Sequence, residues 1–215
     1  SDLRGLVPTP PEKHHACVPI NELPELLQAI SARKPDMAKH AMQLLALTFV
    51  RTGELIGAKW EEIDWEREEW HIPKERMKMK RPHVVPLSRQ TLAILRDLQQ
   101  STGHKPFLFF SAASASWHMS NGTVLMALRR MGYNGRMTGH GFRTLASTIL
   151  NEKGYAPDVI ERQLAHEEQD KIRGAYNRAE YLIERKKMMQ DYADFLERVE
   201  TQQGKNVLAM AKSHA

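Results

Sequence analysis

The chain has 215 residues, of which 41% are hydrophobic and 27% charged, values typical of a folded protein with one large or two small domains. The longest stretch without Asp, Glu, Lys or Arg, residues 106–128, is interrupted by polar side chains, which excludes a transmembrane helix there. A single cysteine, Cys17, excludes an internal disulfide and a cysteine-rich zinc site. The net charge of +5 and the pI near 9.3 favour a polyanionic partner, although many enzymes are equally basic. Because no charged-then-apolar signal segment opens the chain, we expect a cytoplasmic protein.

The two ends of the chain differ in composition from its middle. Four of the first twenty residues are prolines, which is typical of a linker, and residues 201–215 contain few large apolar side chains. We therefore expect a linker over residues 1–20 that continues a longer protein, one folded domain over residues 21–198, and a C-terminal tail over residues 199–215.

Apolar residues at helical spacing predict helices along most of the domain. A first helix is expected near Glu22, and a second after Pro35, with Asp36 as its N-cap and running through Phe49. Later helices are predicted from three apolar groups: Leu92, Leu95 and Leu98; Val124, Leu125 and Leu128; Phe142, Leu145 and Ile149. A final amphipathic helix is expected over residues 182–199.

Between residues 65 and 87 the pattern changes to the alternation of strands. Trp70 and Ile72 alternate with polar neighbours, and Val84 and Val85 form a second apolar run before Pro86. The strongly basic segment 74–81 lies between the two runs. This pattern predicts a small antiparallel sheet with a basic turn, and hence a mainly helical α+β fold.

Two segments in the first half of the domain carry candidate catalytic cations. Arg51 ends an apolar helix and is followed by Gly53 and Glu54, so a carboxylate lies one helical step from the guanidinium; a surface ion pair is the simpler interpretation. Lys78 lies in the basic turn, where a lysine can reach a DNA groove and deliver a proton. A solvated basic turn is the alternative.

Two segments in the second half add histidines, an arginine and a tyrosine. His140 and Arg143 are three residues apart at the start of a helix, so an imidazole and a two-pronged phosphate-binding guanidinium share one face. His166 follows in Leu-Ala-His, and Tyr176 comes ten residues later. A core histidine and a buried structural tyrosine are the alternatives here.

In this order along the chain the candidate residues resemble the active site of the tyrosine recombinase (phage integrase) family: Arg51, Lys78, His140, Arg143, His166 and Tyr176. The segments Val-Arg-Thr-Gly-Glu-Leu, Arg-Pro-His-Val-Val-Pro-Leu-Ser and Ala-Tyr-Asn-Arg-Ala are similar to prophage and pathogenicity-island integrases of the satellite-phage P4 type. The resemblance covers roughly residues 20–198. It implies the catalytic domain of a site-specific recombinase that cleaves and rejoins DNA through a 3′-phosphotyrosine, and so integrates or excises a mobile element.

The resemblance also implies roles for the polar side chains. Arg51, Arg143 and His166 would bind the non-bridging phosphate oxygens, and Glu54 would orient Arg51. Alanine at either arginine is then expected to reduce the cleavage rate by on the order of a hundredfold or more, while leaving folding and most DNA binding intact.

The remaining roles concern the proton transfers. Tyr176 would be the nucleophile, with His140 helping it to lose its proton, and Lys78 would protonate the leaving 5′-oxygen. Tyr181 is the alternative nucleophile, although its place at the start of the final helix favours a packing role.

Binding partners follow from the charge and from the resemblance. The cations expected to contact DNA are Lys74, Arg76, Lys80 and Arg81. Double-stranded attachment-site DNA, a homotetramer on that DNA, a DNA-bending host factor and an excisionase are the implied partners, in the bacterial nucleoid. Neither a metal ion nor another cofactor is expected, because the pair His14-His15 lies in the proline-rich leader segment and is not expected to form a metal site.

Other functions stay open from sequence alone. The main alternative is a catalytically inactive DNA-binding regulator with the same fold. A metal-dependent nuclease and a type IB topoisomerase are further alternatives.

Overall fold

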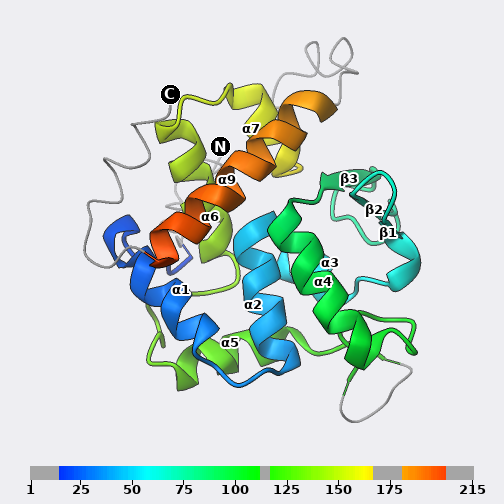
Figure 1. The fold of residues 1–215 in the computed structure, drawn as a ribbon, viewed down its shortest axis with the longest axis horizontal. Helices are drawn as coiled ribbons and strands as arrows, with labels where there is room; N and C mark the ends of the chain where they lie inside the picture. Colours follow the sequence, from blue (N-terminus) through cyan, green and yellow to red (C-terminus); the bar gives the residue numbers. More distant parts are fainter. Residues whose placement is uncertain (1–14, 112–116, 167–180, 202–215) are drawn as a thin grey trace, which may run out of the picture.

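A computed structural model describes residues 15–111, 117–166 and 181–201 of the chain. These residues are mainly helical, with a small sheet at one edge of the molecule (Figure 1). The helices are α1 (Leu23–Ser31), α2 (Met37–Thr48), α3 (Thr52–Ile56), α4 (Arg89–Thr102), α5 (Asn121–Arg130), α6 (Gly141–Glu152), α7 (Pro157–Gln163) and α9 (Leu182–Thr201), with single 3-10 turns η1 (Ile20–Glu22) and η2 (Trp60–Glu62). The strands are β1 (Ile63–Asp64), β2 (Glu69–Ile72) and β3 (His83–Pro86). The predicted α+β fold is confirmed.

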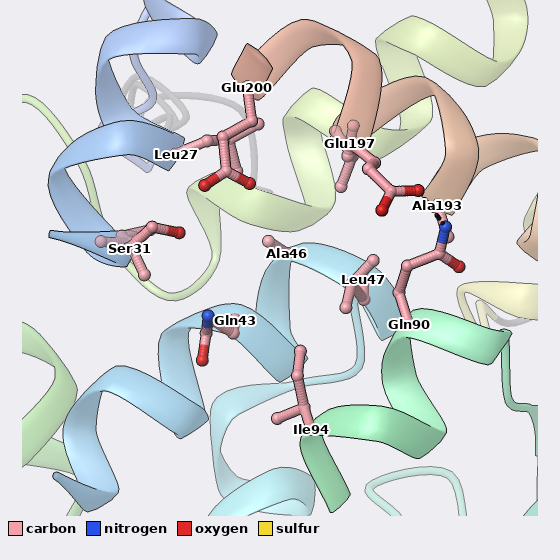
Figure 2. A pocket seen from close by; sticks show the side chains of 12 residues that line it. Leu27, Ser31, Gln43, Ala46, Leu47, Gln90, Ile94, Ala193, Glu197 and Glu200 are labelled. Carbon is pink, nitrogen blue, oxygen red and sulfur yellow. Dashed lines mark hydrogen bonds between the residues drawn. The ribbon is translucent and has the colours of Figure 1, made fainter. Parts of the chain in front are cut away.

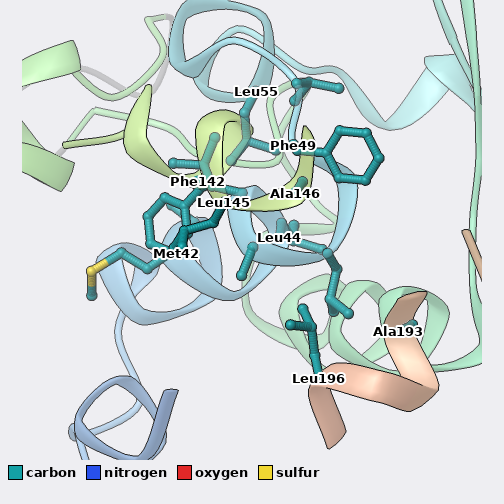
Figure 3. Close-up of a cluster of buried hydrophobic side chains, with 14 of the residues drawn as sticks. Met42, Leu44, Phe49, Leu55, Phe142, Leu145, Ala146, Ala193 and Leu196 are labelled. Atoms are coloured by element: carbon teal, nitrogen blue, oxygen red, sulfur yellow. The ribbon is translucent and has the colours of Figure 1, made fainter. Parts of the chain in front are cut away.

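Helix α2 is the centre of the core. Its sequence is apolar on nearly every side, as expected for a helix that other helices surround. It contacts α1, α3, α4, α5, α6 and α9. Figure 3 shows how side chains of α2, such as Met42 and Leu44, meet Phe142 of α6 and Leu196 of α9. Segments far apart in the sequence thereby contribute to one hydrophobic core.

The two ends of α2 have different caps. At its start the Asp36 carboxylate accepts the backbone N–H of Lys39 at 2.7 Å, which confirms the predicted N-cap. At its end the helix stops at Thr48, one residue earlier than predicted, because Phe49 adopts a left-handed conformation with a φ of 42°. The Phe49 ring is fully buried against Tyr192, with ring centroids 5.4 Å apart. This turn directs the chain toward Arg51.

The three strands form an antiparallel sheet in the order β1-β2-β3, as predicted. Trp70 pairs with Ile63 on one side and with Val85 on the other. Trp70, Ile72 and Val85 are buried, whereas His71, which lies between Trp70 and Ile72, is exposed. These apolar side chains therefore lie on the buried face of the sheet, and His71 lies on the opposite face. The basic segment 73–82 connects β2 to β3.

Helix α9 closes the domain, and its residues 182–199 match the predicted final helix. It packs against α1, α2, α4, α7 and β3 through a buried face that includes Met189 and Phe195. Arg185 in its first turn is fully buried and donates to the Gln163 side chain of α7 and to the Val84 carbonyl of β3. None of the helices in the described part of the chain combines the length and apolarity that a membrane span requires.

Residues 15–18 pack onto the start of α6. Val18 is buried, and the Thr138 hydroxyl donates to the Ala16 carbonyl at 3.2 Å. The packed unit therefore begins before residue 21, where composition placed the boundary between linker and domain.

Candidate active site

Three segments that are distant in sequence meet at one place on the surface. Arg51 immediately precedes α3, His140 and Arg143 lie at the start of α6, and His166 follows the end of α7. Hydrogen bonds between these segments hold four of the six predicted catalytic residues near one another. Helix α2 makes this possible, because α3 and α6 both pack against it and α7 packs against α6.

Arg51 is held by the carboxylate that the sequence placed beside it. Its Nη1 donates to Glu54 Oε1 at 2.9 Å, and Glu54 Oε2 accepts the backbone N–H of Arg51, also at 2.9 Å. Glu54 is buried, whereas the Arg51 side chain keeps 24% of its surface exposed. The carboxylate therefore caps α3 and orients a partly exposed guanidinium.

The Arg143 side chain is buried, in contrast to the partly exposed Arg51. It is 3% exposed, and it donates from Nη1 to the Phe49 carbonyl at 2.6 Å and from Nη2 to the Leu164 carbonyl at 2.7 Å. Burial, followed by the like charge of Arg51, lowers the pKa of Arg143 from 12.5 to about 10, so the side chain stays charged at neutral pH. Its buried Nε has no hydrogen-bond partner among the described residues.

The turn after α7 is bonded to both arginines. Arg143 binds the Leu164 carbonyl, and Arg51 Nη2 donates to the Ala165 carbonyl at 3.2 Å. Arg143 Nη2 also lies 3.2 Å from His166 Nε2. Three consecutive residues, 164–166, are thus tied to the two guanidinium groups, and the left-handed φ of 49° at Ala165 produces the necessary bend.

The partners of His166 define its protonation pattern. Because a guanidinium can only donate, Nε2 accepts from Arg143, and the ring proton then lies on Nδ1. Nδ1 is 2.6 Å from Glu161 Oε2, which accepts the hydrogen bond from the Nδ1–H group. Glu161 is a functional candidate that the sequence reasoning missed; its spacing of five residues from His166 was the only available signal.

His140 is exposed at the rim of this cluster and contacts a second histidine. The rings of His140 and His15 have centroids 4.2 Å apart and are tilted by 39°. Partial burial, followed by His15 and Arg143, lowers the pKa of His140, with further contributions from His166 and Arg51. The neutral imidazole is therefore favoured at neutral pH, which suits a group that accepts a proton.

Close backbone packing places His15 over His140. A Cβ at Gly141 would lie 2.7 Å from the Ala16 carbonyl oxygen, so glycine is needed for residues 15–18 to approach α6. The Cys17 thiol also lies 3.4 Å from the Gly141 carbonyl. From the sequence, His15 is recognisable only as half of the pair His14-His15. No group of three or more potential metal ligands occurs in the parts of the chain that the structure describes.

Lys78 lies on the turn between β2 and β3 and is exposed. Of the four cations expected to contact DNA from this turn, Lys74, Lys80 and Arg81 are also exposed. Arg76 differs, because its guanidinium donates to Glu62 at 2.6 and 2.8 Å and to the Glu54 carbonyl at 3.0 Å. With 19% of its side chain exposed, Arg76 stabilises the fold, and we do not propose it as a DNA contact.

Tyr176 falls outside the described residues, so the predicted nucleophile has no geometry in this structure. The alternative, Tyr181, is partly buried and packs against the hydrophobic core just before α9. Its carbonyl accepts the backbone N–H of Arg185 at 2.8 Å. These contacts give Tyr181 a structural role at the start of the helix.

A pocket elsewhere in the molecule lacks the chemistry of a phosphate site. It lies between α1, α2, α4 and α9 (Figure 2). Its lining is mostly apolar, and its charged residues are Glu197 and Glu200. Carboxylates repel a phosphodiester, so the cationic cluster around Arg51 and Arg143 is the better candidate.

Comparison with known proteins shows the family to which the chain belongs. The phage integrase family matches residues 18–182. The integrase of Enterobacteria phage P4 is 42% identical over 92% of this chain and 49% of its own length. Prophage integrase IntZ of Escherichia coli K12 is 44% identical over 86% of this chain and 46% of its own length. The chain thus spans about half the length of the curated relatives that it matches.

Solved structures share the fold at low sequence identity. An integrase from mycobacterium phage Brujita has a TM-score of 0.65 and 19% identity, covering 95% of this chain and 66% of that one. A lambda integrase dimer bound to a COC′ core site has a TM-score of 0.56 and 17% identity, covering 91% of this chain and 62% of that one. The predicted recombinase fold is therefore confirmed. Together with the match over residues 18–182, it establishes that this chain belongs to the phage integrase family.

Proposed function

We propose that this chain is the catalytic domain of a site-specific DNA recombinase that cleaves and rejoins DNA strands through a covalent 3′-phosphotyrosine. The observation that carries the proposal is the joining of Arg51, Arg143 and His166 by hydrogen bonds from three separate segments, beside an exposed His140. Such an arrangement of cations and imidazoles suits a phosphodiester that gains negative charge during in-line attack.

The arginines and His166 bind the non-bridging oxygens. The exposed part of Arg51 is available to the phosphate, while Glu54 holds its other edge. Arg143 bonds backbone carbonyls through Nη1 and through one Nη2–H, and its second Nη2–H, which faces His166, binds a phosphate oxygen when the imidazole moves aside. His166 adds a further hydrogen-bond donor to these oxygens, and the contact of its Nδ1 with Glu161 orients the ring.

The nucleophile is Tyr176, and His140 assists it. A tyrosine has an ordinary pKa of about 10, so it needs a base to attack at neutral pH. The Tyr176 proton passes to neutral His140 as the bond from its oxygen to phosphorus forms. The bond from phosphorus to the 5′-oxygen breaks in the same step, and Lys78 gives that oxygen a proton. Attack by a 5′-hydroxyl reverses these transfers, so rejoining needs no external energy source.

The substrate is double-stranded DNA. The exposed Lys74, Lys80 and Arg81 supply phosphate contacts next to Lys78, and the structurally similar lambda integrase is bound to a core site. The names of the relatives support integration or excision of a mobile element as the biological reaction. We propose that the protein acts as a homotetramer on DNA in the bacterial nucleoid. A DNA-bending host factor and an excisionase would determine whether that tetramer integrates or excises the element.

Trapping on a nicked suicide substrate tests the proposal. The wild-type protein should form a covalent complex, in EDTA as well as in magnesium, and peptide mapping should locate the nucleotide on Tyr176. Tyr176→Phe should bind DNA without trapping, and Tyr181→Phe, if it folds, should still trap. A labelled peptide containing Tyr181 would reassign the nucleophile. DNA binding with no trapping by the wild-type protein would identify an inactive DNA-binding regulator instead.

A further inference from the structure

The Arg76 guanidinium joins the turn that carries Lys78 to helix α3, whose N-cap residue is Arg51. Arg76 lies two residues before Lys78, and its Nη1 donates to the carbonyl of Glu54 in α3 at 3.0 Å. Glu54 is the residue whose carboxylate holds the Arg51 side chain. A short chain of contacts therefore connects the proposed general acid with one of the proposed phosphate ligands.

The Arg76 guanidinium is itself fixed from several sides. Glu62, which is 6% exposed, accepts from its Nε and Nη2 at 2.8 and 2.6 Å, forming a two-pronged ion pair. The Trp70 indole donates to the same carboxylate at 2.9 Å. A Cβ at Gly57 would lie 2.8 Å from Arg76 Nη1, so only glycine leaves room for the guanidinium in its present position. The cation therefore occupies one position between η2, β2 and α3.

The part of the turn before Lys78 is ordered, and Lys78 itself projects outward. The backbone N–H of Arg76 donates to the Pro73 carbonyl, and that of Met77 donates to the Lys74 carbonyl, at 3.1 and 3.2 Å. The Met77 side chain is buried. Arg76 and Met77 thus anchor the two positions that precede an exposed lysine, which limits the volume that the Lys78 ammonium can explore.

From these contacts we infer that Arg76 is a positioning residue for the leaving-group proton transfer: it holds the Lys78 turn against α3, within reach of a phosphate bound by Arg51. This inference rests on the proposed function, in which Lys78 protonates the 5′-oxygen. Arg76 contributes no proton and touches no reacting atom. Its loss should therefore impair only the step that needs the acid, and leave the attack and phosphate binding largely unchanged.

A substrate that needs no acid separates this role from a purely structural one. We would measure single-turnover cleavage on two suicide substrates, one with an ordinary 5′-oxygen and one with a 5′-bridging sulfur, whose thiolate leaves unprotonated. Lys78→Ala should be slowed about a hundredfold on the oxygen substrate and be rescued by sulfur. Arg76→Lys keeps the charge and loses the two-pronged ion pair with Glu62. Its cleavage of the oxygen substrate should be slowed on the order of tenfold, and the sulfur substrate should restore the rate.

Two further variants complete the design. Gly57→Ala displaces the guanidinium without changing any charge, so it should reproduce the Arg76→Lys pattern and carry the test if Arg76→Lys fails to fold. Arg89→Ala removes an exposed arginine that pairs with Asp194 of α9 at 2.9 Å and has no hydrogen bond or ion pair with Arg76 or Glu62 among the described residues, and should match the wild type on both substrates.

The outcomes distinguish the inference from the proposed function. If Lys78→Ala is rescued by sulfur but Arg76→Lys and Gly57→Ala are equally slow on both substrates, or fully active on both, the inference is overturned and the function stands. If Lys78→Ala stays slow on the sulfur substrate, the acid assignment fails and the inference fails with it. Rescue of all three variants supports the inference.

Discussion

Replacing Arg143 with alanine should destabilise the folded state by about 3–5 kcal/mol, in addition to any effect on catalysis. The side chain is 3% exposed and bonds the carbonyls of Phe49 and Leu164 at 2.6 and 2.7 Å. A hydrogen bond to a charged group contributes roughly 1.5–3 kcal/mol, and alanine leaves both buried carbonyls without this partner. Two such bonds give about 3–6 kcal/mol, and relief of the repulsion from Arg51 offsets a small part. The expectation from sequence that Arg143→Ala leaves folding intact is therefore revised.

Urea unfolding followed by tryptophan fluorescence measures this loss, with Arg89→Ala as the control. The Arg89 side chain is exposed, and its ion pair with Asp194 at 2.9 Å lies at the surface. The control should lose about 1 kcal/mol or less. The reasoning is refuted if Arg143→Ala stays within about 1 kcal/mol of the wild type, or if Arg89→Ala is destabilised equally. An activity loss in Arg143→Ala is informative about catalysis only at temperatures where that variant remains folded.

Three further predictions concern pH and salt. His15→Ala removes a neighbour that lowers the pKa of His140, so the pKa of His140 should rise. The acid limb of the pH–rate profile for cleavage should then move to higher pH, and an unchanged profile would exclude the interaction. Burial, followed by the neighbouring arginines, lowers the pKa of His83 to about 3, so the unfolded state binds more protons between about pH 3 and 6.5 and stability should fall on acidification. Between pH 6.5 and pH 5, His83 should lower the free energy of unfolding by about 2 kcal/mol. In a folded His83→Gln variant, the decrease in this free energy measured by urea unfolding should be smaller by that amount. Lys74→Ala and Arg81→Ala should each reduce the slope of log affinity against log salt by about 1 in DNA titrations, and equal slopes in variant and wild type would remove them from the interface.

The sequence alone determined the elements and most of the candidate residues. Apolar spacing identified α1, α2, α4, α6 and α9, because a helix that buries one face must repeat its apolar residues at the helical period. The alternation of apolar and polar residues around Trp70 identified the sheet, because a strand with one buried face must repeat its apolar residues at every second position. The sequence also paired Arg51 with Glu54, since three residues along a helix start is a local relation that needs no tertiary information.

The same spacing rules failed where the environment of a side chain decides its state. Leu125 shares the helical pattern of Val124 and Leu128, yet it is 42% exposed, whereas the other two are buried. Helix α2 was expected to include Phe49, but tertiary packing against Tyr192 accompanies a left-handed turn there instead. Local periodicity describes one element, and burial depends on which neighbours cover it.

Only the tertiary structure decided what the charged side chains do. Arg76 lies in a run of cations that reads as a DNA-binding turn, but Glu62, fourteen residues away, converts it into an internal ion pair. His15 is brought over His140 from 125 residues away by close packing at Gly141, a relation that no spacing along the chain encodes. Arg143 became a buried clamp because the carbonyls of Phe49 and Leu164 converge on it. The sequence does not show whether a charged side chain is solvated or buried. The fold determines this, because it determines which protein groups replace water around the charge.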